Sequence, residues 1–233
     1  MLNGQRVIAI VPARGGSKSI PGKNIRPLQG KPLLAWSVDV AKQVSEIDRV
    51  IVSTDDAQIA GVGRRHGAEV YARPPHLATD DALVIDALKD LLHRLETEGE
   101  TAEWVILLEP TCPLRSADDV RSCLKLVAER GFDSAATFKE AELNPHRAWR
   151  LEDGVPEVFI PGAIPWLPRQ KLPKAYQLNG AVYVFRAKLL GQEARSLLVG
   201  KPGAVLMPRE RSQDIDDGID FMIVEALLRE TNR

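Results

Sequence analysis

The sequence predicts an α/β protein whose core is a mostly parallel β-sheet with helices on both faces. Short apolar runs rich in β-branched residues, such as residues 7–11, have the length and composition of strands buried on both sides. Longer segments between them repeat apolar residues at spacings of three and four, which is typical of helices that cover a core. Because neighbouring parallel strands need a crossover connection, this alternation predicts a sheet that is covered on both faces.

Each element has its own sequence signal. The first strand, 7–11, stops at Pro12, which cannot donate a backbone hydrogen bond. The first helix, 32–44, begins with Pro32, a residue favoured in the first turn, and the helix 117–130 follows Ser116, a typical N-cap. Apolar runs predict further strands at residues 49–54, 69–71, 104–109, 134–138, 180–185 and 204–207. Apolar stripes predict further helices at residues 57–66, 82–95 and 218–230.

The alternation of strands and helices breaks between residues 141 and 178. This stretch contains six prolines, which exclude a regular helix, and it has no strand pattern. It is too apolar for a disordered linker, since it carries Trp149, Phe159 and Trp166. Large apolar side chains without a core of their own indicate an interface, so we expect a homodimer. The expected organisation is a core of residues 1–140 and 179–233 with an inserted dimerisation segment, 141–178.

Composition and charge exclude several classes of protein. A chain of 233 residues with 44% hydrophobic residues suits one large α/β domain with an insert. It has no run of eighteen apolar residues, and its 31 basic and 32 acidic residues nearly balance. We therefore expect neither a membrane nor a nucleic-acid partner. The two cysteines and the lack of a secretory signal pattern lead us to expect a protein of the reducing cytoplasm.

The loop after the first strand predicts a phosphate-binding site. Gly15 and Gly16 allow a ligand to approach the backbone closely, and Arg14, Lys18 and Lys23 supply positive charge. No acidic residue occurs in the first 38 positions, so this local excess of positive charge points to a polyanion. The spacing fits neither the Walker loop nor the G-x-G-x-x-G dinucleotide fingerprint. The alternative is that the basic segment is only a solvated surface.

A pair of carboxylates precedes the last predicted helix. Asp214 and Asp216 are two positions apart, so in an extended segment both would point the same way. Two adjacent negative charges are unfavourable unless a cation neutralises them, and carboxylate oxygens suit Mg²⁺. The sequence thus predicts a magnesium site; the alternative is that Asp216 or Asp217 only caps the helix.

Five sequence motifs follow one another in an order that resembles one enzyme family. The most specific is Pro-Ala-Arg-Gly-Gly-Ser-Lys at 12–18, followed by Pro21 and Lys23-Asn24. The others are Arg-Pro-x-x-Leu-Ala at 73–78, Leu-x-Pro-Thr-x-Pro-Leu-Arg at 108–115, Arg-Gln-x-Leu-Pro at 169–173 and Asn-Gly-Ala-x-Tyr at 179–183. Over nearly the whole chain they resemble the acylneuraminate cytidylyltransferases, also called CMP-sialic acid synthetases. Glu109 departs from the family's sugar-contacting Gln, Cys112 replaces its Ser, and an aromatic pair near residues 199–200 is missing.

The resemblance implies a Rossmann-like nucleotidyltransferase core with a small inserted subdomain that makes a dimer. The implied partners are CTP and a nine-carbon α-keto acid sugar. The sugar 2-hydroxyl would attack the α-phosphate of CTP, giving a CMP-sugar and pyrophosphate. The implied cofactor is Mg²⁺, held by Asp214 and Asp216. Two alternatives stay open: a nucleotidyltransferase for another sugar, such as Kdo or a sugar 1-phosphate, and a catalytically silent nucleotide-binding scaffold.

The resemblance also implies a role for each candidate site residue. The implied nucleotide-binding residues are Arg14, Gly15, Gly16, Ser17, Lys23, Asn24 and Arg73. The implied catalytic residues are Arg14, Lys18, Lys23, Asp214 and Asp216. Arg14 and Lys18 would hold the β- and γ-phosphates, and Lys23 would stabilise the charge on the α-phosphate. The implied substrate-binding residues are Glu109, Arg147, Arg169 and Tyr183, with Arg169 on the sugar carboxylate.

Overall fold

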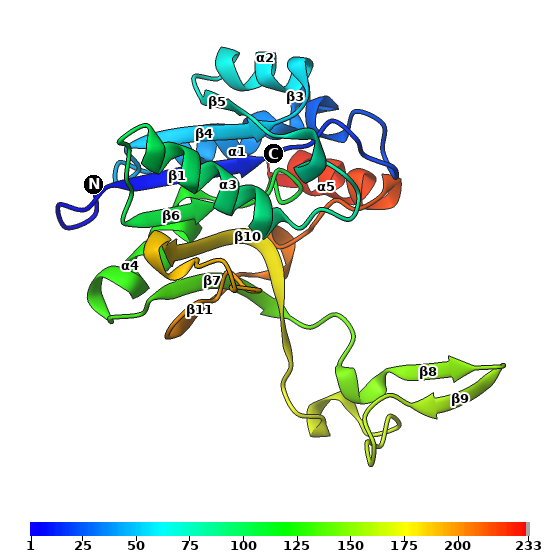
Figure 1. Cartoon of the computed structure of the whole chain (residues 1–233). Coiled ribbons are helices and arrows are strands. Elements are labelled where there is room, and N and C mark those ends of the chain that lie inside the picture. Colours follow the sequence, from blue (N-terminus) through cyan, green and yellow to red (C-terminus); the bar gives the residue numbers. More distant parts are fainter. Residues whose placement is uncertain (232–233) are drawn as a thin grey trace.

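Across residues 1–231, which the computed structural model describes, the main strands form a seven-stranded sheet in the order β11-β7-β10-β6-β1-β4-β5 (Figure 1). These strands are β1 (Val7–Pro12), β4 (Arg49–Thr54), β5 (Glu69–Ala72), β6 (Trp104–Leu107), β7 (Ser134–Glu140), β10 (Tyr176–Arg186) and β11 (Pro202–Leu206). All neighbours pair in parallel except β10, which runs antiparallel to β6 and β7. The mostly parallel sheet predicted from the sequence is confirmed. Residues 232–233 of the predicted core lie outside the described residues.

The helices cover both faces of this sheet, as the alternation predicts. They are α1 (Leu33–Lys42), α2 (Ala57–Arg65), α3 (Val84–Thr97), α4 (Ala117–Glu129) and α5 (Gly218–Thr231). Alternate residues of β1 point to opposite faces. Ala9 joins a buried cluster with residues of α1, α2 and α4, whereas Ile10 joins a second cluster with residues of α3. No helix among the described residues is both long and apolar enough to cross a bilayer.

A third buried cluster fixes the loop after β1 against the last helix. Ile20 from that loop packs with Phe221 and Val224 of α5, and Ile215 fills the same cluster. A small hairpin, β2 (Pro27–Leu28) and β3 (Lys31–Pro32), adds Leu28. Short 3₁₀ helices span Lys23–Ile25, Pro75–Leu77, Pro145–Arg147, Arg169–Lys171, Ala187–Leu189 and Arg209–Arg211. This cluster therefore holds the basic loop and the aspartate segment, nearly 200 positions apart in the sequence, on one side of the protein.

Residues 141–175 project away from the sheet as an arm (Figure 1), whereas residues 176–178 of the predicted segment 141–178 pair with β7 as the start of β10. The expectation that this segment has no strand pattern is wrong, because β8 (Trp149–Glu152) and β9 (Val155–Val158) form an antiparallel hairpin. Its turn is Asp153-Gly154, with φ angles of 49° and 81°, the positive values that a two-residue hairpin turn requires. Pro156 is tolerated because a two-stranded hairpin has two free edges. The arm leaves large apolar side chains exposed, with Trp166 at 84%.

Candidate active site

Two adjoining cavities lie where β1, β5 and β6 end, at the carboxyl edge of the sheet. The basic cavity, of about 480 Å³, is lined by residues of the loop after β1, by Arg73 and by the segment after β6. The acidic cavity, of about 290 Å³, is lined by residues of β7, β10 and the segment before α5. Glu109 and Asp216 line both cavities. The two spaces therefore meet at these carboxylates, where groups bound in each could react.

The basic cavity carries the cations that the sequence predicts for a polyanion. Arg14, Gly16, Ser17, Lys18, Lys23, Asn24 and Arg73 all line it. Arg14 and Lys18 converge on Asp80, at 2.8 Å and 2.6 Å. The hydrogen bond from Lys18, with the charge of Arg14, lowers the pKa of the Asp80 carboxyl. Two cations that share one exposed carboxylate are available to an anion with more charge.

Gly15 and Asn24 both shape the loop after β1, and of these two only Asn24 also lines the basic cavity. The backbone N–H of Gly15 donates to Asp55 Oδ1 at 2.9 Å, so this donor is already in use. A Cβ at position 15 would lie only 3.0 Å from Cβ of Asp56, so glycine is needed for this close approach. The buried Asn24 side chain donates to the carbonyl oxygen of Arg14 at 3.0 Å, which fixes the course of the loop.

Arg73 and Lys23 line the basic cavity from two different segments of the chain. Arg73, beyond the end of β5, is buried and donates from Nη2 to the carbonyl oxygen of Ser53 at 3.0 Å. Burial lowers the pKa of its guanidinium. Lys23 Nζ donates to the carbonyl oxygen of Ile215 at 2.9 Å, between the two predicted metal ligands. Lys23 thus lies beside the place where the two cavities meet.

The two aspartates share the acidic cavity, although their segment is not a strand. Ile215 between them is fully buried in the cluster under α5, so Asp214 and Asp216 turn the other way. Burial and then the charge of Asp214 raise the pKa of Asp216. The capping role belongs to Asp217, whose Oδ1 accepts hydrogen bonds from the backbone N–H groups of Ile219 and Asp220.

Glu109, two residues beyond the end of β6, lies where the two cavities meet. Burial and the nearby charge of Asp214 raise its pKa to about 7. The register of β10 shifts between Leu178 and Tyr183, and Gly180 in this bulge has a φ of 71°. A Cβ on Gly180 would lie 2.9 Å from Glu109 Oε2, so the bulge makes room for the carboxylate. Tyr183 lines the acidic cavity beside it.

The carboxylate oxygens of Asp214 and Asp216 are ligands of the kind that a hard cation prefers. Burial and then the charge of Asp214 raise the pKa of Asp216, and a cation would relieve the repulsion between the two carboxylates. Among the described residues, no group of three or more His, Cys, Asp or Glu side chains is arranged to hold a metal. Mg²⁺ usually takes one or two carboxylates and completes its shell with phosphate and water, so this pair suits Mg²⁺ with a bound nucleotide.

Arg147 and Arg169 do not join these residues within the chain. Both lie in the arm and neither lines the two cavities. Arg147 donates to the carbonyl oxygen of Leu167 at 2.8 Å, and the exposed Arg169 pairs with Glu140 at 2.9 Å. Four further residues that the sequence did not predict as site residues line the acidic cavity: Lys139, Glu142, Gln177 and Asp220. Lys139 lies one position beyond the predicted strand 134–138, where β7 continues to Glu140.

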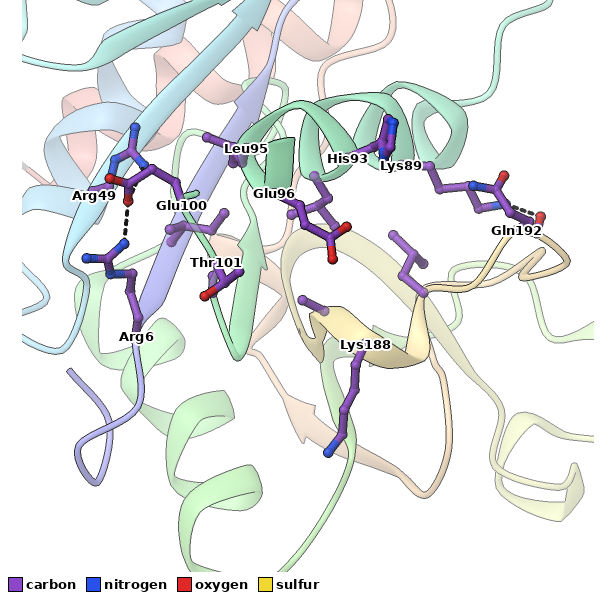
Figure 2. A pocket seen from close by; sticks show the side chains of 15 residues that line it. Arg6, Arg49, Lys89, His93, Leu95, Glu96, Glu100, Thr101, Lys188 and Gln192 are labelled. Atoms are coloured by element: carbon purple, nitrogen blue, oxygen red, sulfur yellow. Dashed lines mark hydrogen bonds and ion pairs between the residues drawn. The ribbon is translucent and has the colours of Figure 1, made fainter. Parts of the chain in front are cut away.

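Another cavity, of about 330 Å³, lies at the opposite edge of the sheet (Figure 2). Arg6 and Arg49 there pair with Glu100, and Lys89 Nζ donates to the carbonyl oxygen of Gln192 at 2.7 Å. These three cations already bind groups of the protein itself, and none of the predicted site residues lines this cavity. The chemistry is therefore expected at the carboxyl edge.

Comparisons with known proteins agree with this placement. A family model described as cytidylyltransferase matches residues 8–198. The chain is 33% identical over 228 residues to the CMP-N,N'-diacetyllegionaminic acid synthase of Legionella pneumophila, covering 96% of each. It is 32% identical over 219 residues to the N-acylneuraminate cytidylyltransferase of Streptococcus agalactiae, covering 93% of this chain and 52% of that protein.

A solved structure of CMP:2-keto-3-deoxy-manno-octonic acid synthetase complexed with CTP has the same fold. It matches with a TM-score of 0.70 at 18% identity, over 97% of this chain and 99% of that chain. A likeness at this identity shows the fold alone. The family model and the relatives above 30% identity carry the assignment: the chain belongs to the acylneuraminate cytidylyltransferase family.

Proposed function

We propose that this protein transfers the cytidylyl group of CTP to a nonulosonic acid, a nine-carbon α-keto acid sugar of the sialic type. One observation carries the proposal: a basic cavity and a polar, acidic cavity meet at Glu109 and Asp216. The first suits a nucleoside triphosphate and the second suits a polyhydroxylated acceptor. The names of the two relatives described above, both more than 30% identical, supply the chemical class of the acceptor.

In the proposed reaction, the anomeric 2-hydroxyl of the acceptor attacks the α-phosphorus of CTP. The bond to the bridging oxygen breaks, pyrophosphate leaves, and the hydroxyl proton passes to solvent. Arg14 and Lys18 would exchange Asp80 for the β- and γ-phosphates and so hold the leaving group. Lys23 would face the α-phosphate and stabilise the negative charge that develops on it. Positioning and charge stabilisation then supply most of the catalysis.

Asp214 and Asp216 would hold Mg²⁺ in this scheme, and the ion would neutralise phosphate charge at the junction of the cavities. Gly16, Ser17 and Asn24 would line the triphosphate, and Arg73 would lie beside the cytidine. Gly15 would contribute through the shape of the loop, because its N–H already binds Asp55. Glu109 and Tyr183, which line the acidic cavity, would contact the acceptor.

A panel of acceptors tests the proposed function. The protein is incubated with CTP, Mg²⁺ and either N-acetylneuraminic, N,N'-diacetyllegionaminic or pseudaminic acid, or Kdo, and released pyrophosphate is measured. We expect turnover with at least one nine-carbon acid that exceeds turnover with Kdo. A preference for Kdo would show that the acceptor is not a nonulosonic acid. No turnover with any acid would favour the catalytically silent scaffold.

We further propose that the arm, 141–175, makes a homodimer and brings the partner's Arg169 towards the acidic cavity. Within its own chain Arg169 is exposed and lines neither cavity, and the arm leaves large apolar side chains exposed. We expect Trp166→Glu to convert the dimer to a monomer, because it puts a charge on the most exposed of these side chains. Sedimentation velocity at micromolar concentration measures this.

The matched control is Ile219→Glu, which places the same charge on a side chain that is 63% exposed on α5. It is expected to stay dimeric. A wild-type monomer would contradict the proposed dimer, and a dimeric Trp166→Glu variant would remove this residue from the interface.

A further inference from the structure

The acidic cavity has an imbalance of charge that a sugar acid would have to overcome. Its carboxylates are Glu109, Glu142, Asp214, Asp216 and Asp220. Among the described residues that line it, Lys139 is the single basic side chain. An acceptor that carries its own carboxylate would be repelled unless a cation faces that group. An acidic acceptor is what the proposed function supplies, and the inference rests on that function.

Lys139 is buried to a degree that is unusual for lysine. Its side chain is only 8% exposed, although it lies near the end of β7, beside Gln177 of β10. A buried ammonium is costly unless acceptors satisfy it, and it carries three N–H donors. Within residues 1–231, the acceptor that its Nζ binds is Glu142 Oε1, in an ion pair of 2.5 Å. The ammonium therefore has donors left for a second anionic group.

Glu142 has the features of a replaceable partner. Its side chain is 52% exposed, and it follows β7 at the start of the arm. The side-chain oxygen of Gln177 accepts a hydrogen bond from the backbone N–H of Glu142 at 3.0 Å, which keeps the carboxylate beside Lys139. A carboxylate on a sugar acid offers the ammonium the same chemistry.

We propose that Lys139 binds the carboxylate of the sugar-acid acceptor, and that Glu142 occupies the ammonium in its absence. Arg169, the arm residue predicted from the sequence to bind the sugar carboxylate, is less well placed to do so within its own chain. Arg169 is 75% exposed, pairs with Glu140 and lies outside the cavity. Lys139 is already inside the cavity that holds Asp214 and Asp216, where the attacking hydroxyl on the neighbouring carbon must lie.

The test compares each acid of the panel with its methyl ester, which removes the negative charge and keeps the sugar. Wild type is expected to prefer the acid by roughly 10- to 100-fold in kcat/KM, the range of a charge-assisted hydrogen bond. Lys139→Met is expected to lose this preference by losing activity on the acid alone. Its KM for CTP should change less than about 2-fold, because the basic cavity is untouched.

Variants of neighbouring charges separate binding from a structural role. Lys139→Arg keeps the cation and should restore most of the preference for the acid. Glu142→Gln removes the competing carboxylate and should lower the KM for the acid by about 2- to 5-fold. If the Lys139–Glu142 pair only supports the fold, Glu142→Gln will instead cost as much activity and thermal stability as Lys139→Met. If Lys139→Met does not fold, the arginine and glutamine variants still decide between these outcomes.

Two results would overturn the assignment. Equal losses on acid and ester in Lys139→Met would make Lys139 a structural residue. An acid preference that survives Lys139→Met and disappears in Arg169→Met would show that Arg169 in the arm, and not Lys139, binds the carboxylate. If wild type turns over an acid, either of these results refutes the assignment of Lys139 and leaves the proposed function standing. Wild type that releases no pyrophosphate with any acid refutes the proposed function and, with it, this assignment.

Discussion

Replacing Lys23 with alanine is expected to lower kcat by about 10²- to 10³-fold, the usual cost of removing one preorganised group from a developing charge. Lys23 Nζ lies 2.9 Å from the carbonyl oxygen of Ile215, beside the junction of the two cavities, so it can face the α-phosphate there. Arg14 and Lys18 remain in the variant and keep most of the affinity for the triphosphate. Steady-state kinetics and a CTP binding titration measure the two effects separately.

The matched control for Lys23→Ala is Lys125→Ala, which removes an equally charged residue from the surface of α4 that lines neither cavity. Its kinetics should equal those of wild type. Thermal melting checks that the loss of the Lys23–Ile215 hydrogen bond leaves the fold intact. A folded Lys23→Ala variant with wild-type kcat would contradict the role given to the loop after β1.

Asp216→Asn is expected to remove Mg²⁺-dependent turnover, with a loss of 10²-fold or more in kcat at a Mg²⁺ concentration that saturates wild type (an order-of-magnitude estimate). The neutral amide oxygen binds Mg²⁺ less well than a carboxylate, and only one other aspartate remains in the pair. CTP binding should largely survive, because Arg14, Lys18 and Arg73, which line the basic cavity, would still hold the nucleotide. A Mg²⁺ titration of activity, with CTP affinity measured in parallel, checks both statements.

Asp217→Asn is the control for this change, because it removes the same charge one residue away. Asp217 caps α5, and asparagine is also a good N-cap, so stability should change little. Its Mg²⁺ dependence should be that of wild type. If both variants behave alike, general loss of negative charge explains the effect and Asp216 is not a ligand.

The local elements could be predicted from the sequence because their signals lie within short windows. The run 7–11, the glycines and cations after it, and Ser116 as the cap of α4 need no knowledge of distant residues. The alternation of strands and helices predicted the sheet and the edge at which its loops meet. Element ends shifted by one or two residues in several places; α1, for example, begins at Leu33 because Pro32 belongs to β3.

The direction of β10 and the lining of the acidic cavity could not be predicted, because they depend mainly on contacts between residues that are remote in sequence. β10 runs antiparallel because the arm returns the chain directly from the end of β7, and nothing in the residues of β10 states this direction. Lys139 acquires its importance only from Glu142, Gln177 and the aspartate segment near position 214. The hairpin in the arm did carry a local signal, Asp153-Gly154, which the six prolines around it obscured.

The most direct test of the proposed reaction follows the phosphorus atoms of CTP by ³¹P NMR during incubation with Mg²⁺ and the preferred sugar acid. We predict that the α-phosphate signal becomes a single phosphodiester, a CMP-sugar, while an equal amount of pyrophosphate appears. Neither signal should form without the acid. Release of CMP and pyrophosphate in the absence of acid, or unchanged CTP with every acid, would contradict cytidylyl transfer by this protein.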